Sequence, residues 1–593
     1  MPGRPKIRCR NVCGHWFREK GGALKSMRFV VAVTLILGAF CATAGQADEL
    51  LFSGDSAGGE AAAEIPAGWQ VQSGSWKVVE DALQGTNCRS RGLNYTARGL
   101  ATDGGEWTDF RLTMEFRVKA RGDDWRDGPW IGFRYRGHHN AYTLGFYESG
   151  AYLHKVSEGR STGDSNPLAM ARAQVDDGQW HTVAITAVGN TIGVRLDGDL
   201  LLAAEDRNWN DSPRVRRGGV VLSARSCGRG RTRVEFRSVR LTRLEDLDAE
   251  VRRAARNNTR TLNRMREFLE RRQSLSLPDT GRRVLAFYYP WYGNPDWRGR
   301  WSHWEGVDRD ASDIANAPHY PDVGPYDSLN PGVLERHVQQ ARSHGVDGFI
   351  CSWWVPGDHR DRAFEKLLQT AEGRDFKVTI YWETVPGPGG HVVDRAASDL
   401  AYVLQKYGDS SAFLKVQGKP VIFAFGRVMN QVMWYEWPEV IRQARRRAGM
   451  DFLLIPGIYR DHYARAFAGV HTYLIASWTS GKSLEEVRSV SRRRYGRAVR
   501  MAERYGKISC LTVIPGFDNS EIQDPSTVVD RRGGELYRAL WRSAIEAGPD
   551  WVLITSWNEW HEGSEIEPSI EHGDNFLRLT GEYSERFKRS ERN

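Results

Sequence analysis

The sequence predicts a multidomain chain: an all-β jelly-roll sandwich, a helical linker and an α/β (β/α)8 barrel of the TIM type, preceded by a targeting segment at residues 1–47. Three patterns lead to this prediction. Short runs that alternate apolar and polar residues fill residues 48–243, one amphipathic helical pattern occupies 244–281, and strand-like and helical patterns alternate from 282 to 593. A chain of 593 residues is long enough for separate cores, because domains usually contain about 100–200 residues.

Composition and charge exclude several classes of protein. A mean hydropathy of -0.54 and 26% charged residues exclude a polytopic membrane protein and a disordered chain. The net charge of +9 is concentrated in residues 1–28, which carry eight basic residues and one acidic residue, whereas residues 48–593 hold 75 basic and 73 acidic groups. This balance predicts no nucleic-acid partner.

The N-terminal segment has the pattern of a cleaved export signal. A positive stretch, Lys25–Arg28, precedes an apolar run, Phe29–Phe40, and the small residues Ala42–Ala44 fit a cleavage site. The run is shorter than the ~20 residues that span a bilayer. We therefore expect export to the periplasm or the extracellular space after cleavage near Ala44, and no membrane span in the mature form. Whether translation starts at Met1 or Met27 stays open.

The sequence contains no metal or cofactor signature. Cys88 and Cys227 share the predicted β domain, and whether they pair stays open, whereas Cys351 and Cys510 lie in apolar runs that predict buried thiols. No CxxC or His/Cys spacing of a metal site is present. Three aspartates that a calcium site might use are interpreted as scattered surface residues, namely Asp123, Asp124 and Asp206.

The β domain shows short alternating strands with turns between them. The strand predictions are Arg111–Val118, Trp130–Tyr135, Trp180–Ile185, Thr191–Leu196 and Val234–Leu241, and Asp197-Gly198 predicts a type I′ hairpin. The phrases GSWKVVEDALQG, RLTMEFRV, GQWHTVAITAVGNTIGVRLDG and VEFRSVRL resemble concanavalin-A-like (laminin-G-like) jelly-roll domains. That resemblance implies the fold and a glycan contact, with domain packing as the alternative. The tryptophans that would form a sugar platform or pack between sheets are Trp107, Trp125, Trp130 and Trp180.

The linker predicts one long helix with a single apolar face. Its apolar residues recur at helical spacing, with charged residues of both signs between them: Leu244, Leu247, Val251, Ala254 or Ala255, Leu262, Met265 and Leu269. This mixture of charges indicates a solvated face and does not indicate a nucleic-acid patch.

Eight apolar, β-rich runs alternate with helical patterns in the C-terminal half and predict the barrel. The alternative is a doubly wound open sheet, which would usually show a Gly-rich first turn that this sequence lacks. The runs are Val284–Tyr292, Val346–Trp354, Lys377–Thr384, Pro420–Gly426, Phe452–Tyr459, Val470–Ser477, Ile508–Phe517 and Trp551–Trp560.

Function in such a barrel gathers at the carboxyl ends of its strands. Those ends are rich in aromatic rings, which stack on sugar faces, and in carboxylates, which supply the acid and base of glycoside cleavage. Because adjacent strand residues face opposite ways, one of the tandem tryptophans must leave the core side. The candidate substrate-binding residues are Tyr289, Trp291, Tyr292, Trp353, Trp354, Glu383, Tyr473, Asn558 and Trp560.

The strongest candidate pair is Glu559 and Glu562 within TSWNEWHEGSEIEP. A turn or short helix there would place both carboxylates on one face, about 5–6 Å apart at Cβ. Two carboxylates so close have pKa values that move apart, which leaves one protonated as an acid and one ionised as a base. The alternative interpretation is an acidic surface turn that also contains Glu565 and Glu567.

Five motifs resemble glycoside hydrolase family 99, the endo-α-1,2-mannosidase family: FYYPWYGNP, WSHW, YPDVGPYDS, GVDGFICSWW and SWNEWHEGSEIEP. The resemblance covers about residues 283–580 and implies hydrolysis of internal α-mannosidic bonds with retention, by participation of the 2-hydroxyl through a 1,2-anhydro sugar. It implies that Glu559 is the base for the 2-hydroxyl and Glu562 the acid/base. Tyr289, Trp353, Trp354 and Tyr473 would line the substrate subsites.

The sequence leaves alternatives. The jelly roll ahead of the barrel and the segment SWTSGKS after the sixth strand depart from the family pattern, so the substrate could be another α-linked polysaccharide, or a sulfated or branched mannan. Glu383 as a covalent nucleophile would make a double-displacement enzyme. A non-catalytic glycan-binding protein is the third hypothesis.

Overall fold

The structure is a computed structural model that describes residues 48–590, with gaps at 53–64, 67, 90–99, 103–106, 123–125, 138, 149, 159, 163–166, 208–212, 228–230, 274, 278–279 and 388–390. Residues 47–593 form one compact unit. The predicted export signal lies outside the described residues.

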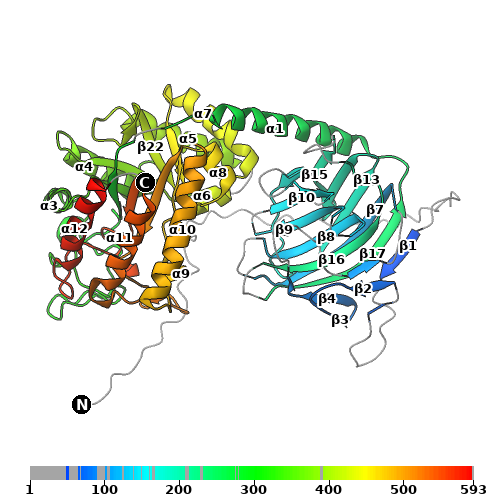
Figure 1. The fold of residues 1–593 in the computed structure, drawn as a ribbon, viewed down its shortest axis with the longest axis horizontal. Coiled ribbons are helices and arrows are strands. Elements are labelled where there is room, and N and C mark those ends of the chain that lie inside the picture. Colours follow the sequence, from blue (N-terminus) through cyan, green and yellow to red (C-terminus); the bar gives the residue numbers. More distant parts are fainter. Residues whose placement is uncertain are drawn as a thin grey trace, which may run out of the picture. The chain divides into compact units, whose positions relative to one another are not determined.

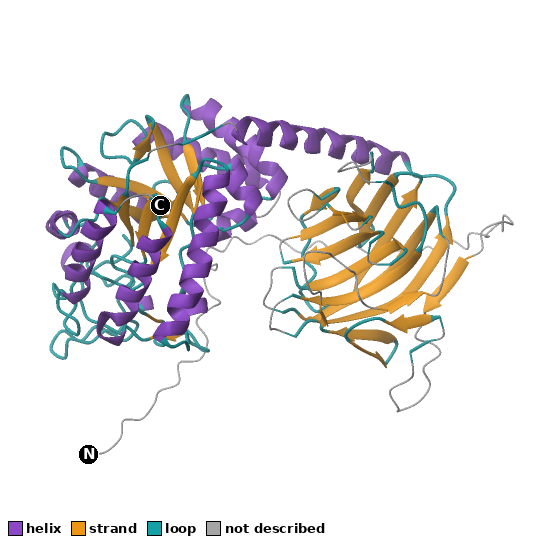
Figure 2. Ribbon diagram, in the orientation of Figure 1, coloured by secondary structure: helices purple, strands orange, loops and turns teal. Residues whose placement is uncertain are grey.

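The N-terminal part is a sandwich of two mainly antiparallel sheets (Figures 1 and 2). In the described residues, one sheet has the order β15-β14-β13-β7-β17-β4-β3 with β1 on β17, and the other has the order β11-β10-β9-β8-β16-β6-β2 with β12 on β10 and β5 on β16. The strands are β1 (Asp48–Phe52), β2 (Trp69–Val71), β3 (Ser75–Val79), β4 (Ala82–Thr86), β5 (Cys88–Arg89), β6 (Leu100–Thr102), β7 (Phe110–Ala120), β8 (Gly128–Tyr135), β9 (Ala141–Tyr147), β10 (Gly150–Ser157), β11 (Arg160–Ser161), β12 (Ala169–Ala171), β13 (His181–Val188), β14 (Thr191–Leu196), β15 (Asp199–Glu205), β16 (Gly219–Ser226) and β17 (Arg233–Arg243).

The sandwich core follows the predicted period of two. On β7 the side chains of Phe110, Leu112, Met114 and Phe116 are buried, and those between them are at least partly exposed. Asp197 and Gly198 both have positive φ, 52° and 90°, which is the backbone of a type I′ turn. The predicted hairpin between β14 and β15 is therefore confirmed.

Three of the four candidate platform tryptophans lie in the described part of the chain, and each contacts neighbouring side chains. Trp130 is buried under the guanidinium of Arg225, 3.8 Å from its ring centroid. Trp180 lies between Arg117 and Arg237, whose guanidinium carbons are 4.6 and 4.1 Å from its ring centroid. Trp107 packs partly buried on the core, and Trp125 lies outside the described residues.

The structure tests two interpretations made for the sandwich: the exposure of Asp206 and the pairing of Cys88 with Cys227. Asp206 is fully buried and bonds the ammonium of Lys155 at 3.0 Å and the hydroxyl of Tyr142 at 2.6 Å, so it is not a surface residue as predicted. Asp123 and Asp124 lie outside the described residues. No disulfide bond joins Cys88 to Cys227.

The predicted linker helix is α1 (Ala249–Gln273), and its apolar face contacts both parts of the chain. Val251 and Ala255 pack on Ala203 of β15, whereas Met265 and Phe268 belong to the large apolar cluster of the barrel. One face of this helix therefore contributes apolar residues to a cluster on the sandwich and to the large apolar cluster of the barrel.

The C-terminal part is the predicted (β/α)8 barrel. Within the described residues its eight parallel strands run in the order β22-β20-β19-β18-β28-β25-β24, with β23 on β22, and the N–H of Ala468 donates to the carbonyl of Leu454 between β23 and β24. These strands are β18 (Arg283–Tyr288), β19 (Gly348–Trp353), β20 (Lys377–Trp382), β22 (Lys419–Ala424), β23 (Leu453–Pro456), β24 (Gly469–Val470), β25 (Ile508–Val513) and β28 (Trp551–Ile554).

Helices cover the outer face of these strands, as Figure 1 shows for α10, α11 and α12. Alternate strand residues, such as Phe349 and Ile350 of β19, belong to two apolar clusters, one against the helices and one in the barrel interior. The remaining elements are α2 (Pro295–Arg298), α3 (Pro331–Ser343), α4 (His359–Ala371), α5 (Val392–Tyr407), β21 (Lys415–Val416), α6 (Gly426–Gln431), η4 (Trp434–Glu436), α7 (Trp437–Ala448), α8 (Asp461–Ala466), α9 (Ala476–Thr479), α10 (Leu484–Arg504), β26 (Phe517–Asp518), β27 (Val528–Val529), η5 (Arg532–Gly534), α11 (Glu535–Ala547), η6 (Trp560–Glu562) and α12 (Asn575–Arg589).

Several strand predictions were too long: the run Trp551–Trp560 contains only β28, Trp551–Ile554, and the sixth run differs most from the structure. The sixth strand, predicted as Val470–Ser477, is only β24, Gly469–Val470, and α9 begins at Ala476. The intervening chain leaves the sheet, with His471 fully buried and Tyr473 turned toward Glu562.

Candidate active site

The predicted pair of glutamates lies just after the eighth barrel strand. The 3-10 helix η6 (Trp560–Glu562) separates Glu559 from Glu562, which confirms the expected short helix. Burial raises the pKa of both carboxyls, and for Glu562 the nearby negative charge of Glu559 adds to burial and raises the pKa to about 8. Their titrations are therefore linked.

Two tyrosines from other strand ends enclose Glu562. The hydroxyl of Tyr473 donates to Glu562 Oε2 at 2.9 Å. Tyr289 follows β18, and burial together with the charges of Glu383, Glu559 and Glu562 raises the pKa of its hydroxyl. Tyr289 is thus adjacent to three carboxylates and stays neutral as a hydrogen-bond donor.

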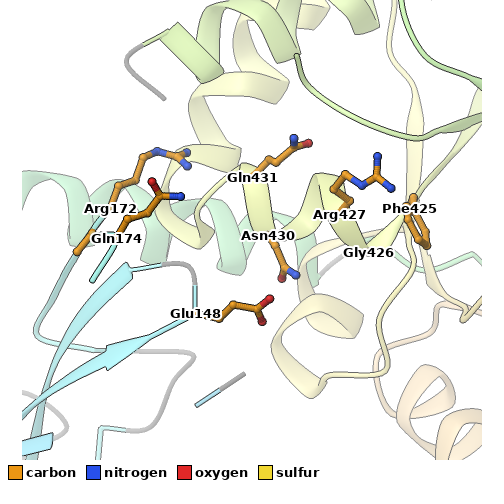
Figure 3. Close-up of a pocket in the computed structure, with 9 residues that line it drawn as sticks. Glu148, Arg172, Gln174, Phe425, Gly426, Arg427, Asn430 and Gln431 are labelled. Atoms are coloured by element: carbon orange, nitrogen blue, oxygen red, sulfur yellow. The ribbon is translucent and has the colours of Figure 1, made fainter. Parts of the chain in front are cut away.

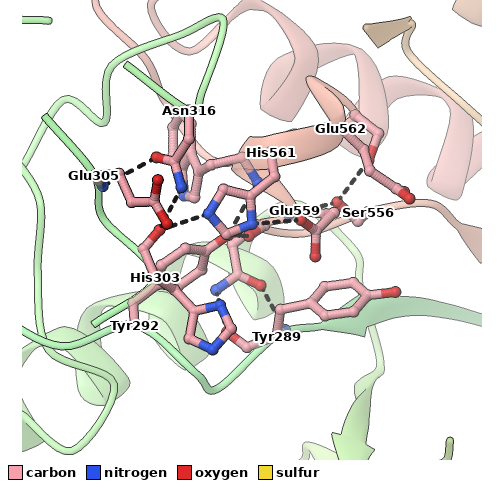
Figure 4. A network of polar contacts seen from close by, with 12 residues as sticks. Tyr289, Tyr292, His303, Glu305, Asn316, Ser556, Glu559, His561 and Glu562 are labelled. Atoms are coloured by element: carbon pink, nitrogen blue, oxygen red, sulfur yellow. Dashed lines mark hydrogen bonds and ion pairs between the residues drawn. The ribbon is translucent and has the colours of Figure 1, made fainter. Parts of the chain in front are cut away.

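Glu559 has one occupied and one open carboxylate oxygen. Its Oε1 lies 3.2 Å from Nδ1 of His561, and its backbone N–H donates to the hydroxyl of Ser556 at 2.7 Å (Figure 4). Its Oε2 is buried and has no hydrogen-bond partner among the described residues. A buried oxygen without a partner is costly, so this atom is a candidate for contact with a substrate hydroxyl.

His561 determines how Glu559 is charged. Its Nε2 lies 2.6 Å from the carbonyl oxygen of His303, so Nε2 must carry a proton. A hydrogen bond from Nδ1 to ionised Glu559 then requires an imidazolium. Burial alone would lower the pKa of His561, but hydrogen bonding to Glu559 and its charge outweigh burial and raise the pKa.

A polar network holds His303 in place on the other side of His561. The carbonyl of His303 also accepts from Nδ2 of Asn316 at 3.1 Å, and the backbone N–H of Glu305 donates to Asn316 Oδ1 at 3.1 Å (Figure 4). The ring of Trp291 stacks on the His303 ring with centroids 5.0 Å apart.

Glu383 follows β20 and forms a third buried carboxyl near the pair. The hydroxyl of Ser352 donates to Glu383 Oε1 at 2.9 Å and accepts from the indole N–H of Trp354 at 3.2 Å. Burial raises the pKa of Glu383 to about 7, although Ser352 and Arg427 oppose that shift.

Three of the predicted substrate-binding residues lie behind the candidate site and position its backbone: Asn558, Tyr292 and Trp560. The side-chain amide of Asn558 accepts from the backbone N–H of Tyr289 at 2.7 Å and donates to the Tyr289 carbonyl at 3.0 Å. The hydroxyl of Tyr292 donates to the Asn558 carbonyl and accepts from the N–H of Trp560. All three side chains are fully buried.

The tandem tryptophans separate as the alternation of a strand requires. Trp353 faces α4, where its indole N–H donates to Asp361 at 2.8 Å, and the structure does not bring it to the carboxylates. Trp354 faces the opposite way, between the guanidinium groups of Arg360 and Arg427.

Sequence reasoning did not single out His561, His303, Ser352 and Ser556. His561 stands between the two candidate glutamates in the printed sequence, and this spacing was the available signal. His303 and Ser352 contact the site from other strands and loops, which no local pattern reveals. No group of three or more His, Cys, Asp or Glu side chains suited to a metal ion occurs among the described residues.

A barrel that holds buried carboxylates and aromatic walls at the carboxyl ends of its strands has the construction of a glycoside hydrolase. Residues 280–580, just over half of the chain, match the model of glycosyl hydrolase family 99, and the chain belongs to this family. Residues 60–242 match a different model, the 3-keto-alpha-glucoside-1,2-lyase-like domain, which the sequence analysis did not name.

Curated relatives and solved structures are similar over the barrel. The glycoprotein endo-alpha-1,2-mannosidase of Rattus norvegicus is 25% identical over 334 residues, which cover 50% of this chain and 69% of that protein. The glycoprotein endo-alpha-1,2-mannosidase-like protein of Homo sapiens is 25% identical over 322 residues, 48% of this chain and 68% of that protein. The structure of the family 99 endo-alpha-mannosidase from Bacteroides thetaiotaomicron is 24% identical, with a TM-score of 0.43, and covers 51% of this chain and 97% of that one.

Proposed function

We propose that this glycoside hydrolase is an endo-acting α-mannosidase that cleaves internal α-1,2-type bonds of a mannan or related glycan with retention. The observation that carries the proposal is the buried pair on one turn, in which Glu559 keeps an open oxygen and Glu562 has a pKa of about 8. The names of the curated relatives support mannosyl glycans as the substrate class.

In the first step, Oε2 of ionised Glu559 takes the proton of the substrate's 2-hydroxyl. That oxygen attacks the anomeric carbon and closes a 1,2-anhydro ring, while Glu562 donates its proton to the departing glycosidic oxygen. In the second step, Glu562 takes a proton from water and the water oxygen bonds to the anomeric carbon. The bond between that carbon and the 2-oxygen breaks, and the 2-oxygen recovers its proton from Glu559. Two inversions give net retention.

The environments of the two carboxyls suit these opposite roles. A pKa of about 8 keeps Glu562 protonated at neutral pH, ready to act as an acid. His561, whose pKa is raised, supplies a positive counter-charge that favours ionised Glu559. The imidazolium therefore lets Glu559 act as a base despite its burial.

The alternative mechanism uses Glu383 as a covalent nucleophile. Glu383 is buried at a strand end close enough to Glu559 and Glu562 for their charges to interact. A nucleophile must be ionised, however, and a pKa of about 7 leaves much of Glu383 protonated at neutral pH. Trapping of a glycosyl-enzyme adduct on Glu383 would support this route and eliminate the anhydro sugar.

The test is product analysis of the purified protein on α-mannan, beside its Glu562→Gln variant. We expect oligosaccharides from the wild type alone, with the first-formed reducing end in the α configuration by proton NMR. If neither protein forms products on α-mannan but the wild type forms them on another α-linked polysaccharide, that polysaccharide replaces α-mannan as the proposed substrate. No products on any glycan, together with glycan binding, would establish the non-catalytic alternative.

We also propose that the protein is exported and that cleavage occurs near Ala44. The proposal is supported by the charged and apolar pattern of Lys25–Ala44. In the described part of the chain, no helix is long and apolar enough to cross a membrane. N-terminal sequencing of the protein recovered from the periplasm or the medium tests it, and an intact Met1 or Met27 terminus would contradict it.

A further inference from the structure

A cavity of about 830 Å³ is lined by residues of the sandwich and of the barrel (Figure 3). Ligand-binding cavities commonly have volumes of about 300–1,000 Å³. The side chains that concern us are Glu148, Arg172 and Gln174 from the sandwich, and Phe425, Arg427 and Asn430 from the segment after β22. Family 99 matches only the second group, since its model begins at residue 280.

The sandwich wall of this cavity is held firmly against the barrel. Arg172 donates to Glu436 in a half-buried ion pair. Next to this pair, Tyr152 and Met170 belong to the same buried apolar cluster as Met433 and Trp434. Burial raises the pKa of Glu436, and the charge of Arg172 opposes that shift.

Side-chain contacts connect the barrel wall of the cavity to the carboxylates. The ring of Phe425 lies 6.3 Å from that of Tyr473, whose hydroxyl donates to Glu562. The guanidinium of Arg427 lies 5.4 Å from the ring centroid of Trp354, and Trp354 bonds the Ser352 hydroxyl that holds Glu383. Phe425 and Arg427, which line the cavity, are therefore linked to Glu562 and Glu383 through one or two intervening side chains.

We propose that the cavity is a distal subsite shared by the two domains, which binds a neutral hexose unit of the same glycan chain that the carboxylates cleave. This inference rests on the proposed function for the identity of that chain. The exposed side chains of Glu148, Gln174 and Asn430 offer the donors and acceptors that sugar hydroxyls need, and Phe425 offers a ring for the apolar face of a sugar. The sandwich domain then serves to select long substrates.

The test compares Gln174→Ala and Asn430→Ala, one variant from each wall. The matched control is Gln70→Ala, an exposed glutamine of the sandwich outside the cavity. We measure kcat/KM on α-manno-oligosaccharides of increasing length, and dissociation constants for the same series in the Glu562→Gln background. Melting temperatures confirm that each variant is folded.

For long oligosaccharides, we expect each cavity variant to lower kcat/KM and to raise the dissociation constant about three- to tenfold, the usual effect of one lost hydrogen bond. The shortest cleaved substrate and the control should be unchanged. Equal effects at every length, or none at any length, would overturn the inference while leaving the proposed function standing. If the wild type cleaves no α-mannan, the proposed function fails, and the length dependence of the dissociation constants alone decides the subsite.

Discussion

The segment after β28 contains two pairs of glutamates whose surroundings differ completely. Glu559 and Glu562 have raised pKa values, and Glu559 keeps a buried oxygen without a partner among the described residues. Glu565 and Glu567, only a few residues further on, are both buried and contact hydrogen-bond and ionic partners.

The second pair receives its partners from distant parts of the chain. Glu565 bonds Arg531 and lies 2.9 Å from Nδ1 of His319; burial would raise its pKa, but the charges of these two residues hold it below the usual value. Glu567 accepts from the hydroxyl of Tyr326 at 2.8 Å and lies 2.7 Å from Nε2 of His337. Glu565 Oε2, like Glu559 Oε2, has no hydrogen-bond partner among the described residues. The two pairs therefore differ in the direction of the pKa shift, which is downward for Glu565 beside its cationic partners and upward for Glu559 and Glu562.

The largest expected effect is the loss of activity when either carboxyl of the first pair is removed. Glu559→Gln and Glu562→Gln should each lower kcat/KM about 10²–10⁴-fold, the usual contribution of a general acid or base. A substrate with a leaving group that needs no protonation should restore Glu562→Gln but not Glu559→Gln. Hydrolysis by both variants at the wild-type rate would show that the two pairs do not differ in function.

The next largest effect concerns the stability contribution of the second pair. Glu565→Gln should lower the free energy of unfolding by about 3–5 kcal/mol, because it leaves the buried guanidinium of Arg531 without its carboxylate. Denaturant melts measure this change. The control Glu585→Gln removes an exposed ion pair with Arg589 and should cost less than about 1 kcal/mol. Equal stability of the two variants would contradict the contrast between the pairs.

A smaller effect is the pH dependence of stability at Glu562. Its folded pKa of about 8 exceeds its ordinary value, so its contribution to stability is fully present below about pH 4.5 and is lost as pH rises through 8. Glu562→Gln should therefore become more stable than wild type by about 1–3 kcal/mol between pH 5 and 8. Thermal melts across that range check this, and a constant difference would argue against the raised pKa.

The smallest effect concerns the hydrogen bond from Tyr473. This bond lowers the pKa of Glu562, so Tyr473→Phe should move the basic limb of the kcat/KM profile upward by about one pH unit. Glu567 gives a matched control, because Tyr326→Phe removes a tyrosine bond from a carboxylate of the second pair and should leave that limb in place. A downward shift in Tyr473→Phe would contradict the assignment of Glu562 as the acid.

Local patterns predicted the elements of this protein well. The strand Thr191–Leu196, its Asp197-Gly198 turn and the linker helix all lie where alternation, turn chemistry and helical spacing place them. The prediction was wrong at Val470–Ser477, because tertiary contacts draw Tyr473 out of the sheet toward Glu562.

The sequence by itself determined the order of the domains, where the eight barrel strands begin and the turn that bears Glu559 and Glu562, since each depends on neighbours in the chain. Only the tertiary structure decided which partners each glutamate receives, because His319, Tyr326, His337 and Arg531 reach Glu565 and Glu567 from far along the chain. Likewise, only folding could place His303 against His561, Ser352 against Glu383 and the sandwich against the segment after β22. The pKa of a buried carboxyl depends on these distant partners, and no local pattern records them.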